Sequence, residues 1–490
     1  MKTPETGRPF ELDWSPLMRE VPEWFRDAKF GLFFHWGPYS VPACLNEWYS
    51  RNMYAKGLPQ NVYHTVKYGP VSEFGYKDFF PYFRGEHFDP EDWADLIVRS
   101  GAKYAGPVSE HSDNFSMWNS TVNPVNSVNY GPHRDVVGEV SRAVKRRGLR
   151  SAATFHHQWL WGWFMSSDPD ADVYDPANEK FYGKALPLET SRMYPWRYPD
   201  EEFNRVWMEK VNEVVDRYDP DLVYFDSRAF VVGEEYRYRM LEHLYRGPAA
   251  RADTVITYKL GDFPSGVGVY DAERGWFEQG RSAPWQTDDR LEDRVTWCYV
   301  EQPKYRTAAQ IIHQLCDVVS KNGNLLLNVG PKADGTFARE AKDVLYEVGD
   351  WLSAFGEAIY GTRPFRVFGE GSTAVGNSDF GVGQIEKQIE NGAFDQDKGT
   401  DFTENDVRYT KKGSALYAIV LGRPRGELAL RSLSGEVLRS CGAIRRVDLL
   451  GGAQDLRWRS EEKALRIALE GELSSPYGNV LKLTFDREPG

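Results

Sequence analysis

The segment EEFNRVWMEKVNEVVDRYDPDLVYFDSR, residues 201–228, joins an amphipathic helix to a short apolar strand. We predict the helix from Glu201 to Tyr218, because its valines recur at helical spacing and form one apolar stripe. The strand, Leu222 to Asp226, ends in a carboxylate. A helix that leads directly into a buried strand is the repeating unit of parallel α/β proteins. We therefore expect a parallel sheet, with Asp226 at the carboxyl end of one strand.

The same alternation of short apolar runs and amphipathic helices extends over the first three-quarters of the chain. One further helix begins at the capping residue Asp89 and ends at Gly101, and another spans Arg134 to Arg147. This spacing predicts a (β/α)8-like barrel in residues 1–364. The expected strands are Lys29 to His35, Tyr104 to Glu110, Leu149 to His156, Leu222 to Asp226, Val255 to Lys259, Val267 to Asp271 and Asn324 to Val329.

The pattern changes after about Arg363. A stretch that contains glycine and asparagine, Gly369 to Asp406, precedes short alternating runs that predict a small antiparallel β-sandwich in residues 365–490. The sequence leaves three roles open for this domain: glycan binding, stiffening of the barrel and assembly of a homo-oligomer. The runs are Ala415 to Leu421, Val447 to Leu450, Ala464 to Leu469 and Val480 to Phe485.

Composition narrows the class of protein. The net charge of −12 repels nucleic-acid phosphates and anionic membranes, so we expect neither as a partner. The four cysteines form no CxxC pair, which argues against a disulfide framework and a zinc ribbon. No stretch has the ~20 apolar residues of a membrane span, and the first residues contain no apolar signal core. These features predict a cytoplasmic location.

Several polar residues fall at the ends of the expected strands, where (β/α)8 barrels carry their chemistry. Two of them, Asp226 in DLVYFDSR and Glu273 in VGVYDAERG, are carboxylates from separate strands. Hydrolysis of a glycosidic bond uses one carboxylic acid to protonate the leaving oxygen and one carboxylate to attack carbon or activate water. Aromatic side chains, 14% of the chain, supply flat faces for sugar rings. The pattern favours a glycoside hydrolase that needs neither a metal nor a cofactor.

A series of motifs resembles the α-L-fucosidases of glycoside hydrolase family 29. The resemblance runs from about Trp14 to Phe365, in order and with compatible spacing. Several motifs in series are more specific than any one alone. They are WFRDAKFGLFFHWGPYSVPA (24–43), NEWY (46–49), SEHSDNFSMW (109–118), YFDS (224–227), VSKNGNLLLNVGPKADG (319–335) and AIYGTRPF (358–365).

The resemblance implies a retaining exo-α-L-fucosidase that removes terminal α-L-fucose from glycans or glycoconjugates through a covalent intermediate. It assigns the nucleophile to Asp226 in YFDS and the acid/base to Glu273, with Glu278 as the nearest competitor. The remaining expected substrate contacts, including two at positions that depart from the family pattern, are His35, Glu47, Trp48, His111, Ser112, His156 and Lys259.

The two departures bear on specificity. Ser112 stands where the family usually has a second histidine, and Lys259 stands where it has an arginine with a bidentate fork. The loss of an imidazole leaves room that a water or a larger sugar could fill. An altered preference, such as for an α-L-galactoside, is therefore one alternative. A carbohydrate-binding pseudoenzyme is another, and a metal-dependent amidohydrolase is disfavoured because FFHWG has only one histidine.

Adjacent aromatic residues near position 160 allow two interpretations. His156 and His157 face opposite sides if they lie on a strand, so only one can enter the barrel mouth, and we expect His156 there. The tryptophans of QWLWGWF, Trp159, Trp161 and Trp163, fit either a sugar-binding wall or core packing. For Trp285 and Trp297 packing is the favoured interpretation.

Overall fold

The computed structural model describes residues 10–186, 199–259, 261–294, 296–373, 401–469 and 473–490. Eight parallel strands close into a barrel in sequence order, with β8 returning to pair with β1. The predicted (β/α)8-like barrel is confirmed. Its strands are β1 Phe30–Phe34, β2 Tyr104–Glu110, β3 Arg150–Phe155, β4 Leu222–Phe225, β5 Val255–Tyr258, β6 Val269–Asp271, β7 Trp285–Arg290 and β8 Gly323–Asn328.

Strand β7 is the one barrel strand that the sequence analysis missed. Its sequence, WQTDDR, has no apolar alternation, yet all six residues are buried. Polar side chains are tolerated there because they hydrogen-bond across the barrel interior. Gln286, for example, accepts from the Tyr104 hydroxyl at 2.9 Å and donates to Asp271 at 2.6 Å. Hydropathy therefore cannot reveal this strand, because its partners lie on distant strands.

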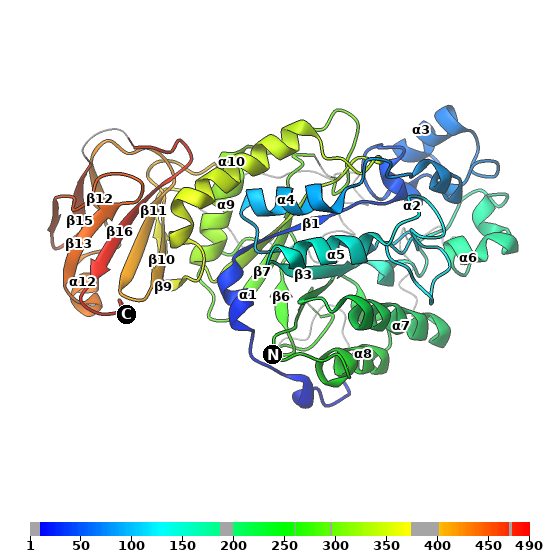
Figure 1. Ribbon diagram of the computed structural model, residues 1–490, viewed down its shortest axis with the longest axis horizontal. Helices are drawn as coiled ribbons and strands as arrows, with labels where there is room; N and C mark the ends of the chain where they lie inside the picture. Colours follow the sequence, from blue (N-terminus) through cyan, green and yellow to red (C-terminus); the bar gives the residue numbers. More distant parts are fainter. Residues whose placement is uncertain (1–9, 187–198, 260, 295, 374–400, 470–472) are drawn as a thin grey trace.

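Helices surround the barrel, although no α-helix is described between β5 and β7 (Figure 1). The helix predicted at Glu201 to Tyr218 is α7, with the same bounds, and Asp200 caps it by accepting from the Phe203 N–H at 3.0 Å. The helices are α1 Glu23–Ala28, α2 Tyr49–Asn52, α3 Pro59–Tyr68, α4 Pro90–Ser100, α5 Val136–Arg146, α6 Glu179–Tyr182, α7 Glu201–Tyr218, α8 Glu234–Arg246, α9 Ala308–Ser320 and α10 Arg339–Phe355. None of the described helices is long and apolar enough to cross a membrane.

The C-terminal part consists of two antiparallel sheets, which share one apolar core and confirm the predicted sandwich. The five-stranded sheet has the order β13-β16-β11-β10-β9 and the three-stranded sheet β12-β15-β14. Of the stretch Gly369 to Asp406, residues 374–400 lie outside the described residues. The elements are β9 Arg363–Glu370, β10 Val407–Lys412, β11 Ala415–Val420, β12 Gly426–Leu430, α12 Gly435–Cys441, β13 Ile444–Leu449, β14 Trp458–Ser460, β15 Leu465–Leu469 and β16 Asn479–Phe485.

Helices α9 and α10 lie between the barrel and the C-terminal sheets (Figure 1). A buried ion pair crosses this junction, because Arg408 on β10 contacts Asp317 on α9 at 2.6 Å. Asp317 also pairs with Lys321 at 2.8 Å, so its two oxygens both have charged partners. Charges that are paired and hydrogen-bonded can be buried at tolerable cost. A buried charged contact therefore joins the C-terminal sheets to helix α9 of the barrel.

Candidate active site

A cavity with an empty volume of about 390 Å³ opens at the carboxyl ends of the barrel strands. Seven of the nine residues predicted to form the site line it, and they come from strand ends and loops far apart in the sequence. The lining residues are His35, Glu47, Trp48, His111, His156, Trp159, Asp226, Ser227, Glu273, Asp288 and Trp297. The barrel therefore brings both candidate catalytic carboxylates into one cavity.

Asp226 follows β4 directly and is held by the Trp159 indole. The Trp159 indole N–H donates to its Oδ2 at 3.0 Å, and the Tyr224 hydroxyl lies 3.4 Å from its Oδ1. Burial by the cavity walls raises the pKa of Asp226 to about 6, although the nearby Lys259 charge opposes the rise. The side chain thus has a fixed orientation and is ionised at neutral pH.

Glu273 lies two residues beyond β6, across the same cavity from a different strand. Burial raises the pKa of Glu273 to about 8, Lys259 opposes this rise, and the charges of Asp288 and Asp226 add to it. The pKa of Glu273 is therefore higher than that of Asp226, and Glu273 keeps its proton over a pH range in which Asp226 has lost its own. Two carboxyl groups with separated pKa values suit a division into acid and nucleophile.

Three histidines form one wall of the cavity. His111 and His156 stack with their ring centres 5.1 Å apart, and His35 contacts both of them edge-on. Desolvation lowers the pKa of His35 to about 4, and desolvation together with the charge of neighbouring histidines lowers the pKa of the other two. All three rings are neutral at pH 7, so each can donate to one hydroxyl and accept from another.

The tautomer of His35 follows from its partners. Its Nδ1 lies 2.7 Å from the Asn328 Oδ1, while the Asn328 amide nitrogen donates to the Trp297 carbonyl. Because Oδ1 can only accept, Nδ1 must carry the proton. The Nε2 atom of His35 is then left as an acceptor for a ligand hydroxyl.

Glu47 and the tryptophans complete the walls. Glu47 accepts from the Trp297 backbone N–H at 2.9 Å, and burial raises the pKa of Glu47 to about 7. Trp48 packs against Trp159 at 5.6 Å between ring centres, and Trp297 tilts over His35 at 5.6 Å. Trp297 thus lines the cavity, whereas packing was the expected role. Trp285 does pack, against Phe277 at 4.5 Å.

Ser112 and Lys259 are not among the residues that line the cavity. Ser112 is buried, and its Oγ lies 3.5 Å from the His156 carbonyl. Lys259 is also buried, and its Nζ contacts Asp271 at 2.6 Å and the lining residue Asp288 at 2.5 Å. Direct contact of either residue with a substrate stays a prediction. The sequence analysis did not single out Asp288, because it lies in the polar strand β7.

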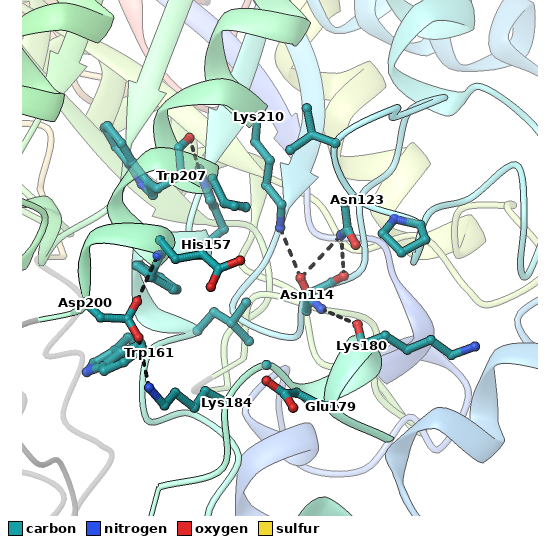
Figure 2. Close-up of a pocket in the computed structure, with 17 residues that line it drawn as sticks. Asn114, Asn123, His157, Trp161, Glu179, Lys180, Lys184, Asp200, Trp207 and Lys210 are labelled. Atoms are coloured by element: carbon teal, nitrogen blue, oxygen red, sulfur yellow. Dashed lines mark hydrogen bonds and ion pairs between the residues drawn. The ribbon is translucent and has the colours of Figure 1, made fainter. Parts of the chain in front are cut away.

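A larger pocket, of about 1370 Å³, lies on the other side of the loop that follows β3 (Figure 2). His157 belongs to this pocket, with its Nε2 3.2 Å from the Trp207 carbonyl and its ring stacked on Trp207. His156 and His157 therefore line different cavities, as predicted, although β3 ends at Phe155 and neither residue lies on a strand. Of the acidic residues on the rim, Asp200 pairs with Lys184 at 3.1 Å.

The three tryptophans of QWLWGWF also lie in different surroundings. Trp159 enters the cavity and donates to Asp226, whereas Trp161 lines the second pocket and packs against Phe203. Trp163 is buried and donates to the Ser50 hydroxyl at 2.9 Å. Only the first of the three is therefore positioned to contact the same ligand as Asp226.

Comparisons with known proteins show the family to which the chain belongs. The family profile described as "Alpha-L-fucosidase" matches residues 1–357, and "Alpha-L-fucosidase C-terminal domain" matches residues 399–484. Tissue alpha-L-fucosidase of Bos taurus is 32% identical over 91% of this chain and 84% of its own length. Its Homo sapiens counterpart is 31% identical over 94% of this chain and 88% of its own length.

Among solved structures, Thermotoga maritima alpha-fucosidase in complex with fucose superposes with a TM-score of 0.72 at 27% identity. The superposition covers 97% of this chain and all of that one. The same enzyme with a mechanism-based inhibitor gives a TM-score of 0.73 at 28% identity, over 96% and 99% of the two chains. The profile matches, relatives and structures all confirm the resemblance noted in the sequence. This chain belongs to the α-L-fucosidase family of glycoside hydrolases.

Proposed function

We propose that this fucosidase is a retaining exo-enzyme that cleaves terminal α-L-fucosides by double displacement, with Asp226 as nucleophile and Glu273 as acid/base. The observation that carries the proposal is the presence of both carboxyl groups in one cavity, with the pKa of Glu273 above that of Asp226. Retaining glycosidases need such a pair, one ionised and one protonated.

In the first step an Asp226 oxygen attacks the anomeric carbon while the Glu273 O–H gives its proton to the leaving glycosidic oxygen. The C–O bond to the aglycone breaks, and a fucosyl ester of Asp226 forms. In the second step the Glu273 carboxylate takes a proton from water, whose oxygen attacks the same carbon and releases Asp226. The sugar keeps its anomeric configuration because the carbon is inverted twice.

We assign sugar binding to the walls of the cavity, namely His35, Glu47, Trp48, His111 and His156. Neutral imidazoles and a carboxylate discriminate hydroxyl orientation, because a mispaired buried polar group costs about 1–3 kcal/mol. Trp48 offers an apolar face to the ring or its methyl group. The α-L-galactoside alternative depended on space beside Ser112, and Ser112 is not among the lining residues. Comparison of kcat/KM for 4-nitrophenyl α-L-fucoside and the α-L-galactoside tests the assignment, and a preference for the galactoside would contradict it.

The pH dependence of activity is the first prediction. Activity requires Asp226 without its proton and Glu273 with its own, so kcat/KM should fall below pH about 6 and above pH about 8. The optimum is then expected near pH 7. The apparent pKa values on the acidic and alkaline limbs of the profile belong to the pair of carboxyl groups, because the two groups interact. An optimum below pH 5 in a kcat/KM profile for 4-nitrophenyl α-L-fucoside would contradict the assigned roles.

The second prediction concerns Trp159→Phe. This change keeps an aromatic ring but removes the N–H that donates to Asp226. A hydrogen bond to a charged group contributes about 1.5–3 kcal/mol, so kcat should fall roughly 10- to 100-fold. Because that hydrogen bond lowers the pKa of Asp226, the acidic limb should move to higher pH. Trp161→Phe is the matched control, and it should leave both kcat and the acidic limb as in the wild type.

We also propose that the protein acts in the cytoplasm, on fucosylated oligosaccharides or glycoconjugates. All four thiols of the chain are free, as expected in a reducing compartment. Recovery of the native enzyme in a secreted or lysosomal fraction of its source cells would contradict this location. The domain boundary between residues 364 and 365, and assembly into a homo-oligomer, stay predictions as well, the latter testable by light scattering.

A further inference from the structure

Asp288 is a third carboxylate in the catalytic cavity, beside Asp226 and Glu273. It lies on β7 with its side chain toward the barrel interior, and it is 2% exposed. Its Oδ1 contacts the Lys259 ammonium at 2.5 Å, and its Oδ2 accepts from the Tyr224 hydroxyl at 3.0 Å. Both oxygens therefore have strong donors, and the carboxylate has one fixed orientation.

Lys259 is the buried cation of this cluster. Its ammonium group is within ion-pair distance of Asp271 and Asp288, and its charge acts on both catalytic carboxyl groups. An unopposed lysine charge at this position would favour ionisation of Glu273, which has to keep its proton for the first step. Two carboxyl groups, Asp271 and Asp288, lie close enough to offset Lys259, and of these two Asp288 is the one that lines the cavity with Glu273.

We propose that Asp288 is a positioning residue that offsets the Lys259 charge, so that Glu273 holds its proton at neutral pH. This inference rests on the proposed roles of Asp226 and Glu273. Asp288 lines the cavity beside both catalytic carboxyl groups, and its ion pair joins Lys259 to that lining.

The Tyr224 hydroxyl adds a geometric argument. It lies 3.0 Å from Asp288 and 3.4 Å from Asp226, so its single proton is directed to Asp288. A tightly held hydrogen bond to Asp226 would reduce the availability of the nucleophile's lone pairs. Asp288 thus accepts the Tyr224 proton, which is then not available to Asp226, and it also pairs with the Lys259 ammonium.

Other titratable and charged groups surround Asp288 and Lys259, and some of them also act on the pKa of Asp226 and Glu273. The Asp288 charge acts in the direction that raises the pKa of both Asp226 and Glu273, whereas the Lys259 charge acts in the opposite direction on both. Arg274 acts in the same direction as Lys259 on Glu273. The groups around the cluster are His35 beyond β1, His156 beyond β3, Tyr224 and Asp226 from β4, Lys259 beyond β5, and Asp271, Glu273 and Arg274 from β6 and the residues after it.

The deciding experiment compares kcat/KM profiles against pH for wild type, Asp288→Asn, Lys259→Gln and Lys259→Arg on 4-nitrophenyl α-L-fucoside. Asp288→Asn removes a negative charge, so both limbs should move to lower pH by about one unit. Lys259→Gln removes a positive charge, so both limbs should move to higher pH. Lys259→Arg keeps the charge and should keep the wild-type limbs.

Asp289→Asn is the matched control. Asp289 is the next residue on β7, is also buried, and faces outward to Arg306 at 2.9 Å and Gln314 at 2.7 Å. Its loss should lower the melting temperature and move the limbs less than Asp288→Asn does, because its charge reaches Glu273 only through Arg274. The proposal would be overturned if Asp289→Asn shifted the limbs of the pH profile as far as Asp288→Asn does. The effect of Asp288→Asn would then be structural.

The proposal would also be overturned if Asp288→Asn lowered kcat or raised KM but kept the pH profile of the wild type. Asp288 would then be a binding or structural residue. If Asp288→Asn does not fold, judged by circular dichroism, the Lys259→Gln and Lys259→Arg pair decides in the same way. Failure of the proposed function has a different signature, namely no wild-type turnover or full activity in Asp226→Ala. The two failures are therefore distinguishable.

Discussion

Replacement of Asp226 by alanine is expected to lower kcat for 4-nitrophenyl α-L-fucoside on the order of 10⁴-fold or more, as for other covalent nucleophiles. Asp226 lies at the end of β4, where the Trp159 indole N–H holds it in the cavity. Without its carboxylate no fucosyl ester can form. Denatured protein from incubations with a mechanism-based 2-fluoro sugar should then show no added mass, whereas the wild type should show one fucosyl adduct.

Azide provides a direct check on this role. In Asp226→Ala the anion can enter the space left by the carboxylate and attack the anomeric carbon once, while Glu273 protonates the leaving group. The product of a single displacement is the β-L-fucosyl azide, with inverted configuration. Asp221→Asn is the control at the opposite end of β4, where Asp221 pairs with Arg150 and Arg251. It should reduce stability and leave kcat within a few-fold; full activity of Asp226→Ala would exclude Asp226 as the nucleophile.

The second large effect is expected for Glu273→Gln, and its size should depend on the leaving group. A poor leaving group, such as a sugar hydroxyl, needs a proton in the transition state, so kcat/KM should fall on the order of 10²- to 10⁴-fold. A 2,4-dinitrophenyl fucoside needs no such proton and should keep kcat/KM within about 10-fold of the wild type. The alkaline limb of the pH profile should disappear, because the group that titrates there with a pKa of about 8 is gone.

Azide again separates the roles. In Glu273→Gln the fucosyl ester of Asp226 forms but lacks a base for its hydrolysis, so azide should speed turnover and yield the α-L-fucosyl azide, with retained configuration. Glu278→Gln is the matched control, because Glu278 lies five residues further along the same segment and is exposed. A larger loss for Glu278→Gln than for Glu273→Gln would transfer the acid/base role to Glu278.

The elements that the sequence predicted well are those whose stability is local. Helix α7 was predicted with its bounds, because its valine stripe lies within one segment of the sequence. Strand β7 was missed for the opposite reason. Its inward polar side chains find hydrogen-bond or ion-pair partners elsewhere in the barrel, as Asp288 does in Lys259. No pattern among neighbouring residues predicts such a pairing.

The same contrast divides the site. The motif YFDS was enough to propose Asp226, because a carboxylate directly after a barrel strand has to emerge at the mouth. The sequence could not predict that Trp159 would be its hydrogen-bond donor, since their separation of 67 residues is bridged only by the fold. Nor could it predict that Lys259 would pair with Asp271 and Asp288 instead of lining the cavity.

The sequence by itself determined the barrel, the C-terminal sandwich and the fucosidase family, because periodicity, caps and motifs are properties of contiguous residues. Only the tertiary structure decided how the carboxylates differ in protonation. The pKa of a buried group depends on desolvation and on charges within a few ångströms, and at Glu273 these charges come from Lys259, Asp288 and Asp226 on three other strands. Proximity of this kind exists only once the barrel has closed.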